Sequence, residues 1–143
     1  MLALPTTIER APPAGPEALA NLREAFGVDL PESLHDLLAE ADGLQGWMEQ
    51  SGAYLSLYTS DEIVLINRMF RKNVAAAEKL LVFASDGGRK LAAFDLTEHP
   101  APILGIPFEM ERSKALFRCG SLEELMDRLQ RSGWERELDL SAL

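Results

Sequence analysis

The stretch Leu80–Leu96, LLVFASDGGRKLAAFDL, decides the fold that the sequence predicts. Its two apolar runs, residues 80–84 and 91–94, stand on either side of a Gly-Gly step. Tight hairpin turns need residues that adopt positive φ at their centre, and glycine does so at no steric cost. We therefore predict a β-hairpin here and work outward from it.

The register of this hairpin follows from its turn. A two-residue loop at Gly87-Gly88 places Phe83 opposite Ala92 and Leu81 opposite Phe94. One face then carries Leu81, Phe83, Ala92 and Phe94, and the other carries Leu80, Val82, Ala84, Leu91 and Ala93 beside Asp95. Both faces are apolar, so we expect the hairpin in mid-sheet with other elements packed on each side. A turn at Asp86-Gly87 is the alternative, but with that register the side chains divide less cleanly between the two faces.

Composition indicates one globular domain: the chain has 143 residues, of which 47% are hydrophobic and 26% charged. Its apolar runs are too short to span a membrane, and its start lacks the regions of a secretory signal. The single cysteine, Cys119, excludes an intramolecular disulfide and is expected to be buried and structural, which fits a cytoplasmic location. With His35 and His99 it makes no zinc site without carboxylates, so we expect no metal and no cofactor.

Charge is distributed unevenly along the chain. The formal net charge is −9, and ten acidic residues between Glu17 and Leu65 accompany one basic residue, Arg23. The rest of the chain is neutral, so the whole excess lies in this part. Phosphate binding requires a basic surface, and nucleic acid is therefore not an expected partner. The acids either solubilise the protein or form a surface for a protein partner of opposite charge.

Secondary structure in the first half follows from periodicity and from turn residues. Residues 1–16, rich in proline, predict an extended arm or a disordered terminus. Apolar spacing predicts a helix over Glu17–Phe26 and a second helix that ends before Gly43, with His35 on its polar side. Residues 44–52 mix apolar and polar side chains, and we expect Trp47 and Met48 to be partly buried anchors. Ala53–Tyr58 predicts a strand.

Thr59 and Glu62 match a capping box, in which each of the two side chains accepts a hydrogen bond from the exposed backbone N–H of the other residue. This capping box begins a third helix. Beyond the hairpin, residues 103–108 and 115–118 predict strands. Ser121 and Glu124 form a second capping box, before a helix with the apolar stripe Leu122, Leu125, Met126 and Leu129. Trp134 is expected to pack back onto the core, and residues 132–143 form a tail.

These elements predict one α+β domain over residues 17–131: a mainly antiparallel sheet of about four to six strands, packed with helices.

The ordered motifs resemble the SUKH superfamily of Smi/Knr-like proteins. The segments that carry the resemblance are Val28–Pro31 leading into a helix that ends at Asp42-Gly43, Tyr54–Leu57 with Ser60–Ile63 and Asn67, Leu81–Gly88 with Ala93–Asp95, and Ser121–Leu125. Two segments depart from the family pattern: Arg89-Lys90 after the glycines, and residues 45–51. The resemblance implies an α+β fold and a non-catalytic binding role.

Many bacterial members of this superfamily look like immunity proteins, which neutralise toxins, often nucleases, in the cytoplasm. Fungal relatives are linked to the regulation of cell-wall synthesis. The resemblance therefore leaves two functions open: neutralisation of a protein toxin, and a regulatory or scaffold role toward a cellular protein.

Catalysis is not expected. Asp86 and Asp95 are the obvious acid pair, but the predicted register puts them at opposite ends of the hairpin, too far apart to share a substrate atom. Gly87-Gly88 lacks the Lys-Ser/Thr sequel of a phosphate loop. A small hydrolase is the outlying alternative.

The predicted partner surface is acidic. Glu32, Asp36 and Glu40 recur every four residues, so they form one stripe opposite the buried leucines of the second helix. The other members lie near helix ends or supply aromatic anchors: Asp42, Asp61 and Glu62, with Trp47 and Tyr54.

Overall fold

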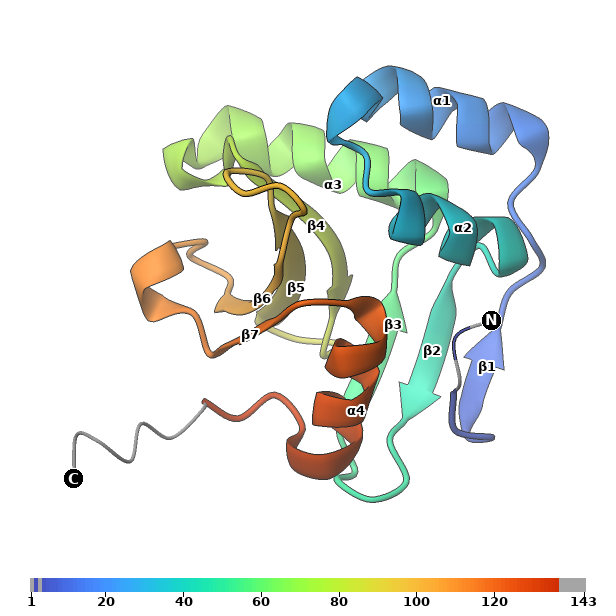
Figure 1. Cartoon of the computed structure of the whole chain (residues 1–143), viewed down its shortest axis with the longest axis vertical. Coiled ribbons are helices and arrows are strands. Elements are labelled where there is room, and N and C mark those ends of the chain that lie inside the picture. The colour runs from blue at the N-terminus through green and yellow to red at the C-terminus, as the bar shows by residue number, and fades with distance from the viewer. Residues whose placement is uncertain (1, 3, 137–143) are drawn as a thin grey trace.

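The computed structural model describes residues 2 and 4–136 of the chain. Within these residues a single antiparallel sheet of seven strands runs in the order β1 to β7, accompanied by four α-helices (Figure 1). The elements are β1 (Ile8–Arg10), α1 (Pro16–Phe26), α2 (Glu32–Glu40), β2 (Leu44–Trp47), β3 (Tyr54–Leu57), α3 (Ser60–Asn73), β4 (Leu80–Ser85), β5 (Lys90–Asp95), β6 (Ile103–Pro107), β7 (Phe117–Cys119) and α4 (Leu122–Ser132). Three 3-10 turns complete them: η1 (Gly27–Asp29), η2 (Ala75–Ala77) and η3 (Arg112–Lys114).

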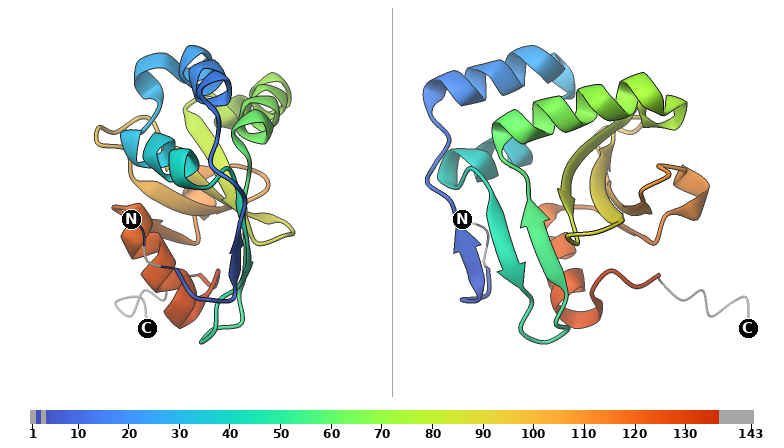
Figure 2. Two further views of the ribbon diagram at one scale, coloured as in Figure 1. Left: turned by 90° about the vertical axis from the view of Figure 1, so that its right-hand side faces the viewer. Right: turned by 180° about the vertical axis from the view of Figure 1, so that it is seen from behind.

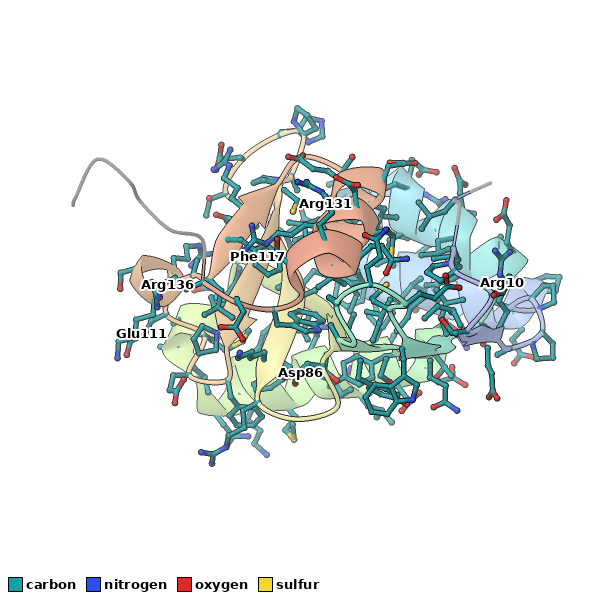
Figure 3. The ribbon with its side chains drawn as sticks, turned by 90° about the horizontal axis from the view of Figure 1, so that it is seen from below. Arg10, Asp86, Glu111, Phe117, Arg131 and Arg136 are labelled. Carbon is teal, nitrogen blue, oxygen red and sulfur yellow. The ribbon has the colours of Figure 1, made fainter. Side chains whose placement is uncertain are left out.

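The predicted α+β class with one antiparallel sheet is confirmed, although the sheet has more strands than the four to six expected. The two unexpected strands are β1, inside the predicted N-terminal arm, and β2, inside the mixed segment. Both are short, at three and four residues, which is why neither gives a clear periodic signal. β1 is one edge of the sheet, where Figure 3 labels Arg10, and Glu111 lies toward the opposite end of the molecule.

Two cores lie on the two faces of the sheet. The first joins one face of all the strands to the apolar sides of α1, α2 and α4. The second is smaller and joins the other face of β4, β5 and β6 to α3 and η2. The sheet thus has a covered half, β4–β6, with helices on both faces, and an open half, β1–β3. From behind, no helix crosses β1–β3 (Figure 2, right).

The central hairpin has the predicted pair Leu81–Phe94, and both of its faces are buried as expected. The predicted pairing of Phe83 with Ala92 is wrong, because a β-bulge at Phe83 moves Ala92 opposite Ala84. Phe83 and Ala84 consequently both belong to the first core, although Ala84 was predicted on the other face.

The physical reason lies in the turn of the hairpin. Ser85 pairs with Leu91 and the Asp86 N–H donates to the Lys90 carbonyl, so residues 87–89 form a three-residue loop. The Asp86 carboxylate accepts hydrogen bonds from the N–H groups of Gly88 and Lys90. Gly87 adopts a φ of 83°, as such a turn requires. Because this loop shifts the register by one residue, the bulge restores the inward direction of the apolar side chains.

Asn67 completes the sheet where β3 ends. The β3–β4 ladder pairs Ser56 with Ser85 and Leu57 with Ala84, and the chain then leaves the sheet to enter α3. The buried amide of Asn67 accepts from the Val82 N–H at 2.8 Å and donates to the Val82 carbonyl at 2.8 Å. This side chain therefore takes the place of a neighbouring strand and satisfies both backbone groups of Val82.

The predicted capping box of α3 is confirmed, and that of α4 is confirmed for one of its two hydrogen bonds. Thr59 Oγ1 accepts from the Glu62 N–H and Glu62 Oε1 accepts from the Thr59 N–H, so the capping box of α3 is confirmed. At α4, Ser121 Oγ accepts from the Glu124 N–H, but the Glu124 carboxylate accepts from Gly120 rather than from Ser121.

The C-terminal side of α4 also returns to the core as predicted. Trp134 is buried and donates its Nε1–H to the Tyr54 carbonyl at 2.8 Å. Cys119 is buried as expected. In the part of the chain that the structure describes, every helix is too short or too polar to cross a membrane.

Candidate functional site

The predicted partner-binding residues fall on two sides of the sheet. Glu32, Asp36 and Glu40 lie on α2, whose leucines pack into the first core. Trp47 and Tyr54 lie on the other side of β2 and β3, where the open half carries no helix (Figure 2). The structure therefore offers two candidate binding surfaces in place of one.

The α2 stripe consists of Glu32, Asp36 and Glu40, all exposed and all opposite the buried leucines of α2. Glu32 binds Arg23 through both carboxylate oxygens, at 3.0 Å to Nη1 and 3.4 Å to Nη2. The hydrogen bond and the charge of Arg23 lower the pKa of Glu32, and Glu32 raises the pKa of Arg23 in return. Arg23, the single base between residues 17 and 65, therefore neutralises part of this stripe.

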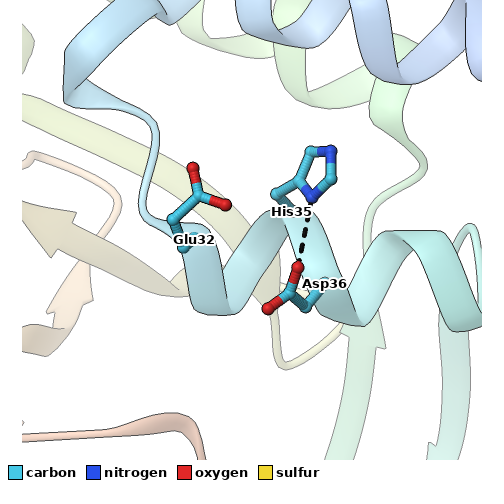
Figure 4. Close-up of side chains that lie close together, drawn as sticks. All are labelled: Glu32, His35 and Asp36. Carbon is cyan, nitrogen blue, oxygen red and sulfur yellow. Dashed lines mark hydrogen bonds and ion pairs between the residues drawn. The ribbon is translucent and has the colours of Figure 1, made fainter.

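His35 lies beside the stripe, and its Nδ1 is 3.3 Å from Asp36 Oδ1 (Figure 4). Ligand atoms of Glu32, His35 and Asp36 lie within 4.8 Å of one another, which makes this the one potential metal-binding triad in the described residues. The Glu32 carboxylate already binds the Arg23 guanidinium. High-affinity metal sites normally hold their ligands in place through surrounding hydrogen bonds. In this triad, by contrast, two of the three side chains are exposed.

The open face, as defined here, consists of the outward side chains Glu9, Gln45, Trp47, Tyr54 and Ser56. Glu9 pairs with Gln45 and Gln45 with Ser56, so these three form a polar row across β1, β2 and β3. Trp47 pairs with Tyr54, and their rings contact edge to face at a centroid distance of 4.9 Å. Trp47 is 59% exposed, which corrects the expectation that it is a partly buried anchor, whereas Met48 is buried.

A cavity of about 340 Å³ lies along this polar row, whose three members all line it, and reaches the N-terminus of α3. Its lining includes the carboxylates of Glu9, Asp42 and Glu62, and also Arg10. Asp42 accepts hydrogen bonds from the backbone N–H and the hydroxyl of Ser60, and Glu62 closes the capping box. Asp42 and Glu62 therefore stabilise the start of α3 besides lining the cavity.

Asp61 is separated from both surfaces. It is exposed and lines a hollow between α1 and α3, together with Glu24 and Arg68. Another groove, of about 500 Å³, lies between η1, the turn after β5 and the start of α4, and Glu32 is the one predicted site residue in its lining.

The acid pair Asp86 and Asp95 lies at opposite ends of the hairpin, as predicted. Burial alone raises the pKa of Asp95, but hydrogen bonds from Thr97 and the nearby Arg112 guanidinium lower it overall. The ionised Asp95 thus accepts from Thr97 and Arg112 and holds the turn after β5 in place.

Sequence reasoning missed Glu9, Gln45 and Ser56. Gly46 carried a signal for the neighbouring strand β1 but for none of these residues, since a glycine inside an alternating stretch marks the close approach of another backbone. A Cβ at Gly46 would collide with the backbone of Thr7 and Ile8, so glycine lets β1 pair against β2.

Residues 13–128 match the model of the SMI1 / KNR4 family (SUKH-1). The match spans most of the chain, and the protein belongs to this family. The search of curated proteins found no match.

Proposed function

We propose that this chain is a non-catalytic protein-binding module of the immunity type, which neutralises a basic bacterial toxin domain in the cytoplasm. One observation carries the proposal beyond family membership. Nine of the ten acidic residues between Glu17 and Leu65 are exposed, and Asp42 is the exception. Arg23 is the single base in that stretch, so the helices α1 and α2 and the start of α3 present a negative surface.

A negative surface suits such a partner for a physical reason. Nucleases hold phosphates in basic clefts, and an inhibitor gains by presenting carboxylates where phosphates would bind. Complementary charge accelerates encounter and selects the right partner more than it adds affinity. The candidate acids for catalysis, Asp86 and Asp95, are engaged in turn hydrogen bonds, which supports a binding role.

The test is to identify a toxin domain encoded beside the gene, to co-express it with the chain, and to measure growth and the association between the purified proteins. We expect restored growth, nanomolar binding and an association rate that falls steeply with ionic strength. Absence of both rescue and binding would contradict the proposal and favour the regulatory or scaffold function.

The contribution of the α2 stripe is tested by reversing its three charges, Glu32→Lys, Asp36→Lys and Glu40→Lys together. A matched control reverses three exposed acids from outside the acidic stretch: Glu109, Glu111 and Asp127. If the stripe faces the partner, the first variant loses association rate and salt dependence and the control does not. Equal kinetics in the two variants would place the contact on another surface.

A further inference from the structure

We propose that the partner docks on the open face and that Trp47 is the residue that anchors it. This inference rests on the proposed function, since it names the surface and the chemistry of the same protein partner. The occupant is a protein surface that offers an apolar pocket for the indole of Trp47 and Arg or Lys side chains around it.

The first argument is the exposure of Trp47. Although 59% of this side chain is accessible, its neighbours Gly46 and Met48 are buried. Trp47 belongs to neither core, so the fold does not need the indole for packing. Tryptophan and tyrosine are the residue types that most often dominate the energy of a protein–protein interface.

The second argument is that the aromatic pair is already ordered. Tyr54 packs edge to face against Trp47, donates its hydroxyl toward Gln45 at 3.4 Å, and lies against the turn glycine Gly87. Trp134, on the opposite side of the sheet, donates a hydrogen bond to the Tyr54 carbonyl. A partner therefore loses little conformational entropy in ordering these rings when it binds.

The third argument is charge. No Lys or Arg occurs between Arg23 and Arg68, a segment that includes the whole of β2, the turn after it, β3 and the first half of α3. Glu9, Asp42 and Glu62 line the cavity along the polar row, and Arg10 is the one base in the lining. A basic partner is complementary to this rim, and an arginine there also stacks favourably on an exposed indole.

The open face differs in this respect from the α2 stripe. The exposed side of α2 offers Glu32, Asp36 and Glu40 but no large apolar side chain. Exposed ion pairs contribute little affinity, so a surface of carboxylates alone steers a partner without holding it. The open face combines a polar row with an aromatic anchor, which is the usual composition of a stable interface.

The test compares Trp47→Ala with Phe108→Ala. Phe108 is also an exposed aromatic, 46% accessible, and it contacts Phe70 edge to face, but it follows β6 in the other half of the sheet. The probe is a catalytically inactive form of the toxin domain encoded beside the gene. We expect Trp47→Ala to raise Kd about 30-fold or more and Phe108→Ala to change it less than about threefold.

Tryptophan fluorescence supplies a second readout. Of the two tryptophans, Trp134 is buried in the free protein and Trp47 is exposed. Binding should shift the emission to shorter wavelength and protect it from acrylamide, and both effects should vanish in Trp47→Phe. A Trp47-dependent dimer in the absence of toxin would instead assign the face to a second copy and overturn the proposal.

The outcomes separate the inference from the proposed function. If the wild type restores growth and binds, but Trp47→Ala binds equally well and acrylamide access is unchanged, the open face is not the contact and the proposed function stands. If the wild type neither restores growth nor binds the toxin domain, the proposed function fails and the inference fails with it.

Discussion

The covered and open halves of the sheet show how the same secondary structure is buried on both faces in one place and accessible on one face in another. In β4 every residue is buried, and in β5 all but the first are, because α3 covers one face and the first core covers the other. In β2 and β3 buried residues alternate with exposed or half-buried ones. The strands of the covered half therefore consist of continuous apolar runs, while those of the open half leave one row of side chains accessible.

The largest expected effect concerns the covered half. Phe83 is fully buried and contacts Phe94 at a centroid distance of 4.8 Å, so Phe83→Ala leaves a cavity that the bulged strand fills poorly. We expect a loss of about 3–5 kcal/mol in the free energy of unfolding, measured by urea denaturation. An unchanged denaturation midpoint would mean that the covered half does not dominate stability.

Asn67→Ala tests how the two halves are joined. The substitution leaves the Val82 N–H and carbonyl without their partner in a buried setting, and we expect a loss of about 2–4 kcal/mol. Asn73→Ala is the matched control. Asn73 donates to the Met69 carbonyl as Asn67 donates to the Ile63 carbonyl, but Asn73 is exposed. Equal losses for the two variants would show that Val82 finds another partner.

Asp95→Asn tests an electrostatic contribution at the end of the covered half. The pKa of Asp95 lies below its ordinary value of 3.8, so its ionised form stabilises the fold above that pH. This stabilisation is lost as the pH falls through 3.8 toward the lower folded-state pKa. In urea titrations between pH 6 and pH 3, the wild type should lose more stability than Asp95→Asn; parallel curves would exclude this role.

The smallest expected effect is on the open half. Trp47→Ala should lower the free energy of unfolding by less than about 1 kcal/mol, because the indole is mostly exposed and the substitution removes its edge-to-face contact with Tyr54. The same urea measurement applies. A loss as large as that of Phe83→Ala would show that the open face is a structural surface and would remove the contrast between the halves.

Local signals predicted much of this fold. The capping box of α3, the Ser121 cap of α4, the helix stripes and the hairpin faces apart from Ala84 depend on neighbours in sequence, and these predictions agree with the structure. The bulge at Phe83 was not predictable from the Gly-Gly step, because the same two glycines fit both a two-residue loop and the three-residue loop at residues 87–89. β1 was missed because its pairing partner, β2, lies beyond two helices in the chain.

The candidate site was predicted less completely. Charge and residue type selected Glu32 and Trp47 together, yet α2 and β2 place them on opposite sides of the sheet. Nothing local marked Glu9 or Ser56, which join the polar row only because β1 and β3 flank β2. A surface assembled from three strands has no pattern within any one of them.

By itself the sequence determined which segments are apolar, where the helices begin and that the excess negative charge lies in residues 17–65, since each depends on composition or short spacing. Only the tertiary structure decided which acids share a surface and which aromatic ring stays exposed. The physical reason is that long-range packing sets these features: α3 covers β4–β6 and stops short of β1–β3, so Trp47 remains accessible although its residue type is usually buried.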